Sequence, residues 1–196
     1  MPRTPAPGTR ERILGVASRL FYEHGVRAVG MNQVVTEAGT GKNLLYRHFP
    51  TKTDLVAAYL TGAHERRTEA ARCAMAAAGD DPREQLVALV EEVATAMARY
   101  GRGCAFRNYL AEFPDDADLA ADAPAGVAQG HLADARETIV RLVGELGVDD
   151  PEALVEEFWL LLDGLYQQAA YRDRLDRHLG VDAAVRLARR LVGTPA

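Results

Sequence analysis

Cysteine and long apolar runs are both scarce in this chain of 196 residues, and each scarcity excludes a class of protein. Cysteine occurs only at Cys73 and Cys104, in neither a CxxC motif nor a Cys/His metal-ligand spacing. We therefore expect no disulfide framework and no metal site, and reduced thiols are typical of a cytoplasmic protein. No segment approaches the roughly 18 apolar residues of a membrane helix. Residues 1–12 also lack the apolar segment of a secretory signal.

Catalytic motifs are missing as well. The chain contains no GxSxG, HExxH, P-loop or GxGxxG pattern, and its five histidines, at positions 24, 48, 64, 131 and 178, show no ligand spacing. We therefore expect neither an enzyme nor a protein with a bound cofactor.

Strand patterns are absent too, because no segment alternates apolar and polar residues over a sufficient length. Apolar residues instead recur at helical spacing along the chain, which predicts an all-α fold of about nine helices. The predicted helices run from Thr9 to about His24, over 32–38, over 41–48, from 51 to about 78, over 82–100, over 105–112, over 131–146, from Pro151 onward, and after Gly180.

Side chains that can cap a helix precede several of these segments. Thr51 with Asp54 three residues later forms a capping-box pattern. The other expected caps are Thr9, Asp81 with Glu84 as its box partner, and Asp182.

Charge is unevenly distributed along the chain, whose net charge is −5. Residues 1–52 hold eight Arg and Lys and three acidic residues, a balance of +5; the remaining 15 basic and 25 acidic residues leave −10. A basic head on an acidic body is typical of a polyanion-binding module joined to a second function, although chance asymmetry is the alternative.

The stretch Gly30–Phe49 lies within the basic head and predicts two short helices around the turn at Gly39. Such a pair is typical of a helix-turn-helix, whose second helix lies in the DNA major groove. We therefore predict a DNA-binding domain over residues 1–52 and a helical effector-binding and dimerisation domain over residues 53–196. The inward residues of the helix pair are expected to be Val34, Val35, Ala38, Leu45 and Phe49.

Three motifs in the head carry a family resemblance: TRERIL…A..LF…HG from residue 9, V-x-x-AG at 35–39, and K-x-x-LYRHFP-x-K-x-x-L at 42–55. Over Thr9 to about Leu60 the chain resembles the TetR family of bacterial one-component regulators. The segment 103–115, GCAFRNYLAEFPD, is also similar to one TetR subgroup. The resemblance implies repression, a homodimer on a pseudo-palindromic double-stranded DNA operator, and release by a small-molecule effector. Gly30, Gly41, Asn43 and Leu44 depart from the usual family residues.

The resemblance places the DNA contacts mainly on the second short helix. Lys42 and Asn43 lie in its first turn, where side chains meet base edges, and Leu44 suits a thymine methyl group. The remaining contacts offer donors to phosphates, although Arg47 as a solvated surface charge is an equal alternative. The full set is Lys42, Asn43, Leu44, Tyr46, Arg47, His48 and Lys52.

A single short reading helix buries little DNA surface, so dimerisation is expected. The resemblance implies a four-helix interface from the last two helices of each subunit, and the alternative is that both helices lie in a monomer core. The expected interface residues are Leu154, Phe158, Leu161, Leu165, Val185, Ala188, Leu191 and Val192.

An effector site would combine aromatic walls with a few polar groups, although each of these residues could instead be plain core. Cys104 lies near Arg102 and Arg107 in sequence, and their charge would lower a thiol pKa, so sensing of electrophiles or oxidants is an alternative to an inert thiol. A helical protein-interaction module is a third hypothesis, which leaves the basic head unexplained. The candidate pocket residues are Met97, Tyr100, Cys104, Phe106, Asn108, Tyr109, Phe113, His131, Trp159, Leu162 and Tyr166.

Overall fold

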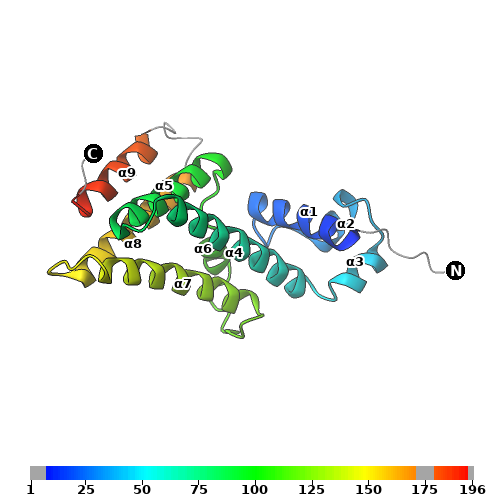
Figure 1. Cartoon of the computed structure of the whole chain (residues 1–196). Helices are drawn as coiled ribbons and strands as arrows, with labels where there is room; N and C mark the ends of the chain where they lie inside the picture. The colour runs from blue at the N-terminus through cyan, green and yellow to red at the C-terminus, as the bar shows by residue number, and fades with distance from the viewer. Residues whose placement is uncertain (1–7, 171–178, 194–196) are drawn as a thin grey trace. The chain divides into compact units, whose positions relative to one another are not determined.

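The computed structural model describes residues 8–170 and 179–193, and over these ranges it contains helices and no strand, which confirms the all-α prediction (Figure 1). None of the helices within these ranges is long and apolar enough to cross a membrane. The helices are α1 (Thr9–His24), α2 (Met31–Glu37), α3 (Lys42–His48), α4 (Lys52–Ala77), α5 (Pro82–Tyr100), α6 (Ala105–Glu112), α7 (Pro124–Gly144), α8 (Pro151–Ala170) and α9 (Leu179–Leu191).

The chain divides into two compact units that are not contiguous in sequence. Unit 1 joins Met1–His64, described from Gly8, with Ala105–Gly130; unit 2 joins Glu65–Cys104 with His131–Ala196. Helices α4 and α7 therefore each contribute one part to each unit. The predicted division at residue 52 follows the DNA-binding motif, whereas unit 1 also takes in the first half of α4 and all of α6.

Unit 1 is built around α1, which packs against α2 and α3. One face of α1 is buried through Ile13, Ala17, Leu20 and Phe21, the set that the helical spacing predicts. The ring of Phe21 lies 5.7 Å from that of Tyr59 in α4, at a tilt of 55°. These contacts give the short helices α2 and α3 a stable support, which helices of seven residues need because they are too short to be stable alone.

The capping box at the start of α4 is formed as predicted. The Asp54 carboxylate accepts from the Thr51 amide at 2.8 Å, and the Asp54 amide donates to the Thr51 hydroxyl at 3.1 Å. At α5, Asp81 accepts from the Arg83 amide at 2.9 Å, with Pro82 as the first helical residue. Both helix starts therefore satisfy backbone donors that have no partner inside the helix.

Three expected caps are wrong in detail. Gly8 precedes α1, and Thr9 is already inside the helix and buried. The Glu84 carboxylate lies 3.5 Å from Nη1 of Arg189 in α9, so this long-range partner replaces the expected box contact. Asp182 lies within the first turn of α9, because that helix already begins at Leu179.

Helix α7 begins at Pro124, seven residues before the predicted start at 131. Its first turns are buried through Ala125 and Ala128, and small residues do not produce the stripe of large apolar side chains that reveals a helix in sequence. A Cβ at Gly126 would lie 2.0 Å from the carbonyl oxygen of Ala120, so only glycine fits this close approach.

Unit 2 contains a core in which α5, α8 and α9 pack against one another. Helix α7 adds Ile139, Leu142 and Val143 to this core. Arg67 and Glu92 join α4 to α5 by a bidentate ion pair, with N–O distances of 2.8 and 2.5 Å. Burial alone would lower the pKa of Arg67, but the Glu92 carboxylate, together with Tyr166 and Cys104, more than offsets burial and holds that pKa above its usual value.

Candidate nucleic-acid interface

The turn between α2 and α3 is formed by backbone hydrogen bonds and one glycine. The Thr40 amide donates to the Val35 carbonyl at 3.1 Å, and Gly39 between them has φ +58°. This left-handed conformation is the one that glycine adopts without a Cβ penalty. Gly41 is extended and precedes the first residue of α3. The structure thus places the turn where the sequence predicts it.

The inner face of the two helices is apolar. Val34, Ala38, Leu45 and Phe49 are buried as predicted, whereas Val35 is only half-buried. Leu45 is fully inaccessible to solvent. Because side chains three and four residues apart share a helix face, burial of Leu45 determines which residues of α3 point outward.

The outer face of α3 carries polar and basic side chains. Lys42, Asn43 and Arg47 are exposed, and the Tyr46 side chain is 38% exposed. The Lys42 ammonium lies 5.9 Å from the centre of the Tyr46 ring, one turn further along the helix. Neither Lys42 nor Arg47 has a carboxylate partner among the residues that the structure describes. This face can therefore offer donors and positive charge to an external anion.

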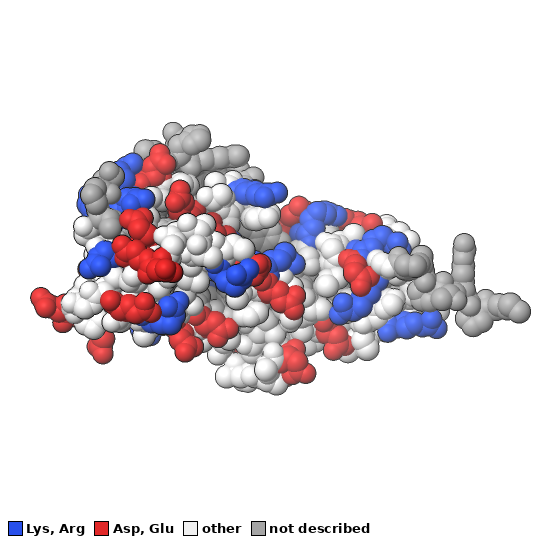
Figure 2. All heavy atoms as spheres, in the orientation of Figure 1, with Lys and Arg blue, Asp and Glu red and all other residues white. Residues whose placement is uncertain are grey.

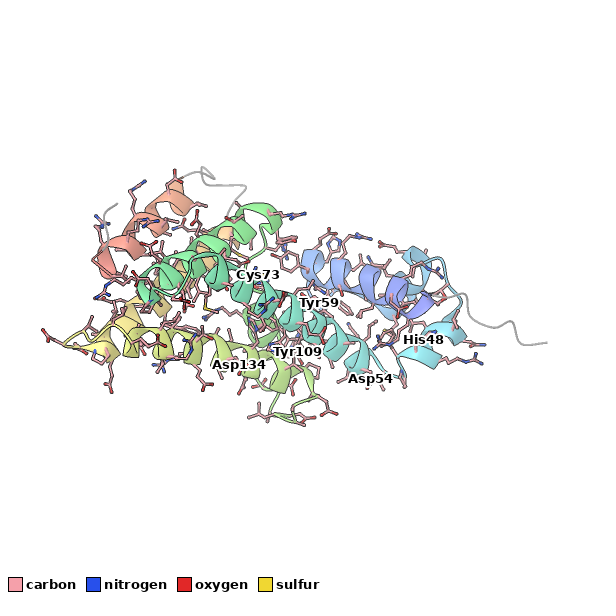
Figure 3. The ribbon with its side chains drawn as sticks, viewed as in Figure 1. His48, Asp54, Tyr59, Cys73, Tyr109 and Asp134 are labelled. Carbon is pink, nitrogen blue, oxygen red and sulfur yellow. The ribbon has the colours of Figure 1, made fainter. Side chains whose placement is uncertain are left out.

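Three expected DNA contacts lie in less open positions. Leu44 is half-buried, and the Nε2 atom of His48 (Figure 3) is buried with no hydrogen-bond partner among the described residues. Lys52, the first residue of α4, is partly covered, and this burial lowers the pKa of its ammonium while the Glu112 carboxylate acts in the opposite direction. A phosphate contact by His48 through Nε2 would therefore require the ring to move.

Three arginines of α1 contact the helix pair formed by α2 and α3. Arg12 donates from Nε to the Ala38 carbonyl at 3.1 Å, at the end of α2. Arg19 pairs with Glu37 at 2.5 Å, and the Arg10 guanidinium lies 5.0 Å from the Phe49 ring centre. Sequence reasoning did not assign these roles, because the contacts join residues that are distant in the chain. Figure 2 shows Lys and Arg over the α1–α3 end of unit 1, with some acidic side chains among them.

The comparisons with known proteins agree with this geometry. Residues 13–59 match the family model described as bacterial regulatory proteins, tetR family. HTH-type transcriptional regulators from Staphylococcus aureus strains USA300 and COL are each 45% identical to the chain over 53 residues, 27% of this chain and 29% of theirs. The chain thus matches less than a third of the length of these relatives.

Solved structures extend the likeness over the whole fold. A TetR-family transcriptional regulator from Streptomyces coelicolor is 27% identical, with a TM-score of 0.84, and the match covers 94% of each chain. The chain therefore has the fold of the TetR-family transcriptional regulators. A regulatory protein TetR from Rhodobacter sphaeroides shares the fold, with 19% identity, a TM-score of 0.73, and coverage of 95% of this chain and 97% of that one.

In this TetR-like fold, the candidate pocket residues fall in both units. Met97, Cys104 and Leu162 are buried in unit 2, while Phe106 and Tyr109 are buried in unit 1. They do not form one cluster within a unit, so the predicted effector site stays a prediction. The half-buried members are Asn108 and Phe113 in unit 1 and His131, Trp159 and Tyr166 in unit 2.

Tyr100 is the clear exception among these residues. Its side chain is 56% exposed and packs beside the Arg99 guanidinium, 5.5 Å from the ring centre. Tyr100 is the last residue of α5, where the helix ends at Gly101 with φ +72°. Tyr100 therefore stays a predicted pocket residue, at a position that is largely open to solvent.

The two thiols differ in environment. Cys104 is buried, and Arg67 of α4 interacts with it electrostatically, which the sequence did not predict. Cys73 is exposed, and a hydrogen bond to the Glu69 carboxylate at 3.3 Å raises the pKa of its thiol. Cys73 is thus accessible to solvent, but its raised pKa makes its thiol less reactive.

The predicted dimer-interface residues lie mostly in the core of unit 2. Five of them are buried by the helices of their own chain, which leaves little surface for a partner. For those five, the interface role stays a prediction beside the core packing that the single chain shows. The five are Leu154, Phe158, Leu165, Ala188 and Val192; Leu161, Val185 and Leu191 are partly buried and stay predictions.

Proposed function

We propose that this chain is a TetR-family repressor that binds a pseudo-palindromic operator as a homodimer and is released by a small-molecule effector. One observation carries the proposal: the face of α3 opposite the buried Leu45 presents Asn43 and Arg47 to solvent, and Lys42 is exposed in the first turn of the same helix. Asn43 offers a bidentate donor and acceptor pair to adenine, and Lys42 reaches the acceptors of guanine. Tyr46 and Arg47 provide donors for phosphates.

Two exposed leucines support dimerisation through α8 and α9. Leu160 of α8 is 69% exposed and Leu187 of α9 is 37% exposed, whereas Leu154, Leu162 and Leu165 of α8 are buried. Large apolar side chains on a surface are typical of an interface when they lie close together. We therefore add Leu160 and Leu187 to the proposed interface, together with the partly buried Leu161, Val185 and Leu191. A double Leu160→Glu, Leu187→Glu variant should shift the sedimentation coefficient from dimer to monomer.

DNA binding is tested first with the chain's own upstream DNA, in a gel shift over a series of salt concentrations. Specific binding should weaken linearly in a plot of log affinity against log salt. Lys52→Ala should reduce the slope by about one and weaken binding to every sequence. No binding at low salt would overturn the regulator proposal.

Base reading is tested separately at Asn43. Selection from random DNA should return a different preferred half-site for Asn43→Ala, while overall affinity for non-specific DNA changes little. An unchanged half-site would remove Asn43 from the base-reading residues. Arg47→Ala serves as the comparison, because a phosphate contact should lower affinity without changing the preferred sequence.

Thiol sensing through Cys104 is the alternative route of release. The proximity of Arg67 favours it, because a nearby positive charge stabilises a thiolate. Burial of Cys104 opposes it, because burial limits access by an electrophile. The DNA-bound protein should be treated with N-ethylmaleimide: release that persists in Cys104→Ser would exclude Cys104, and release that persists in Cys73→Ser would exclude Cys73.

A further inference from the structure

The end of α6 contacts the connection between α1 and α2, although about 85 residues separate the two in sequence. The Glu112 carboxylate accepts from the Val26 amide at 3.1 Å and from the Arg27 amide at 2.8 Å, one through each oxygen. All of these residues belong to unit 1. A carboxylate with two backbone donors is a charge-assisted contact, stronger than a bond between neutral groups.

The connection is closely fitted to this carboxylate. At Gly25 the backbone has φ +85°, and a Cβ there would lie 2.8 Å from the Glu112 Oε1 atom. The next two amides point to Glu112 rather than continuing the hydrogen-bond pattern of α1. Val26 and Val29 are both buried, so the connection is attached to the core from the other side.

A second contact extends the attachment beyond Glu112. The Arg27 guanidinium lies 4.8 Å from the centre of the Phe113 ring, which stacks on Tyr109 at 4.8 Å. The Tyr109 hydroxyl in turn donates to Asp116 at 2.6 Å. Figure 3 labels Tyr109, which lies on α6. Phe113, Tyr109 and Asp116 therefore extend the support for the chain as it enters α2.

From this geometry we propose that Glu112 is a positioning residue for DNA binding. By accepting from Val26 and Arg27 it holds the α1–α2 connection, and with it α2 and α3, in the orientation that the DNA-bound state uses. The proposal rests on the DNA binding proposed above. It assigns α6 to the DNA-binding machinery, although α6 lies outside residues 13–59, which match the family model.

Loss of the Glu112 charge and loss of its hydrogen bonds should change DNA affinity in opposite directions. Glu112 is an acidic residue in a basic part of the protein and acts electrostatically on Lys52. Removing its charge alone should strengthen the attraction of DNA phosphates. Removing its hydrogen bonds should weaken DNA binding. Helices α2 and α3 would then sample several orientations, and only the molecules in the DNA-binding orientation could bind. The sign of the change therefore separates the two effects.

The attachment itself is tested by amide hydrogen exchange in the full chain, without DNA. In Glu112→Ala the amides of Val26 and Arg27 should exchange about tenfold faster, as expected when a bond to a charged group worth at least about 1.5 kcal/mol is lost. Glu112→Gln should lie between this variant and the wild type, because its single carbonyl oxygen accepts from only one of the two amides. Unchanged exchange at both amides in Glu112→Ala would overturn the proposal.

DNA affinity is the second readout, measured by fluorescence anisotropy on a duplex that the wild type binds. If freeing the connection leaves the head competent in about a fifth of the molecules, affinity falls about fivefold in Glu112→Ala. The salt slope should stay unchanged, since no phosphate contact is lost. Asp115→Asn is the matched control: it is exposed, lies three residues further on, and should bind DNA equally or more tightly.

The outcomes separate this proposal from the proposed function. Equal or tighter DNA binding by Glu112→Ala, with faster exchange, would show that the attachment does not position the head, and the proposal fails. Absence of DNA binding by the wild type would instead refute the proposed function, while exchange would still report the attachment. Concentrations of folded protein are set by circular dichroism, and Glu112→Gln provides the comparison if Glu112→Ala folds incompletely.

Discussion

The charged side chains of α3 and those of unit 2 have different partners. In unit 2, Arg67 pairs with Glu92 and Arg189 with Glu84, and Arg136 also pairs with Glu156. On α3, within the described part of the chain, Lys42 and Arg47 have no carboxylate partner. These three arginines of unit 2 thus have carboxylate partners in their own chain, whereas Lys42 and Arg47 of α3 are left for an external anion.

This difference shows why net charge is a poor guide to partners in this chain. The overall value of −5 conceals a helix whose positive charge is not compensated nearby. The position of a charge matters more than the net charge of the chain, because exposed charges act over only roughly 10 Å at moderate salt. Support for α3 comes from the opposite, apolar face and from arginines of α1, so its outer residues are not needed for folding.

The largest expected effect comes from removing that apolar support. Leu45→Ala should lower the free energy of unfolding by about 2–5 kcal/mol, because Leu45 is fully buried and its replacement leaves a cavity. Leu187→Ala, on the exposed surface of unit 2, should change stability of the isolated chain by less than about 0.5 kcal/mol. Urea unfolding followed by circular dichroism measures both. Equal losses in the two variants would contradict this account of where the core lies.

The second effect tests the ion pairs directly. Arg67→Ala should cost about 1–3 kcal/mol of unfolding free energy, because it leaves the mostly buried Glu92 without its partner. Arg136→Ala breaks a pair of exposed side chains and should cost less than about 1 kcal/mol. Arg47→Ala, which breaks no pair, should leave stability unchanged while weakening DNA binding. A large stability loss in Arg47→Ala would mean that α3 is not free for an external partner.

Sequence reasoning succeeded where local signals determine the structure. The bounds of α6, the capping box of Thr51 and Asp54, and the turn at Gly39 depend on neighbouring residues, so they could be predicted. The start of α7 was missed, because Ala125 and Ala128 are too small to produce a recognisable apolar stripe. The existence of the helices was therefore easier to predict than the residues at which they begin and end.

The candidate site divides in the same way. The outward face of α3 follows from helical spacing once Leu45 is taken as buried. The contact of Glu112 with Val26 and Arg27 could not be predicted, because it joins segments that are brought together only by the tertiary fold. A protein core and a dimer interface both use apolar residues such as Phe158. The residue type alone therefore could not separate the two roles.

A smaller effect concerns the starts of the helices. Thr51 and Asp54 cap α4, whereas the residue before α3 is Gly41, which has no side chain to cap it. A Cβ at Gly41 would meet nothing within 4 Å, and its backbone is extended. Gly41→Ser should therefore raise the free energy of unfolding by a few tenths to about 1 kcal/mol. Thermal unfolding measures the gain, with Gly41→Ala as the control for lost backbone freedom without a cap; equal gains in the two variants would exclude capping.

The smallest effect at neutral pH comes from Tyr109, whose hydroxyl has a hydrogen-bond partner within unit 1. Burial, and the hydrogen bond to Asp116, raise the pKa of the Tyr109 hydroxyl. A raised pKa in the folded state favours the protonated form, so the stabilisation is complete below pH about 10, the ordinary tyrosine value, and is lost as the pH rises through the raised pKa. Unfolding free energies measured between pH about 8 and 11 should therefore decline more steeply in the wild type than in Tyr109→Phe. A decline that Tyr109→Phe leaves unchanged would show that the Tyr109–Asp116 bond does not couple this proton to folding.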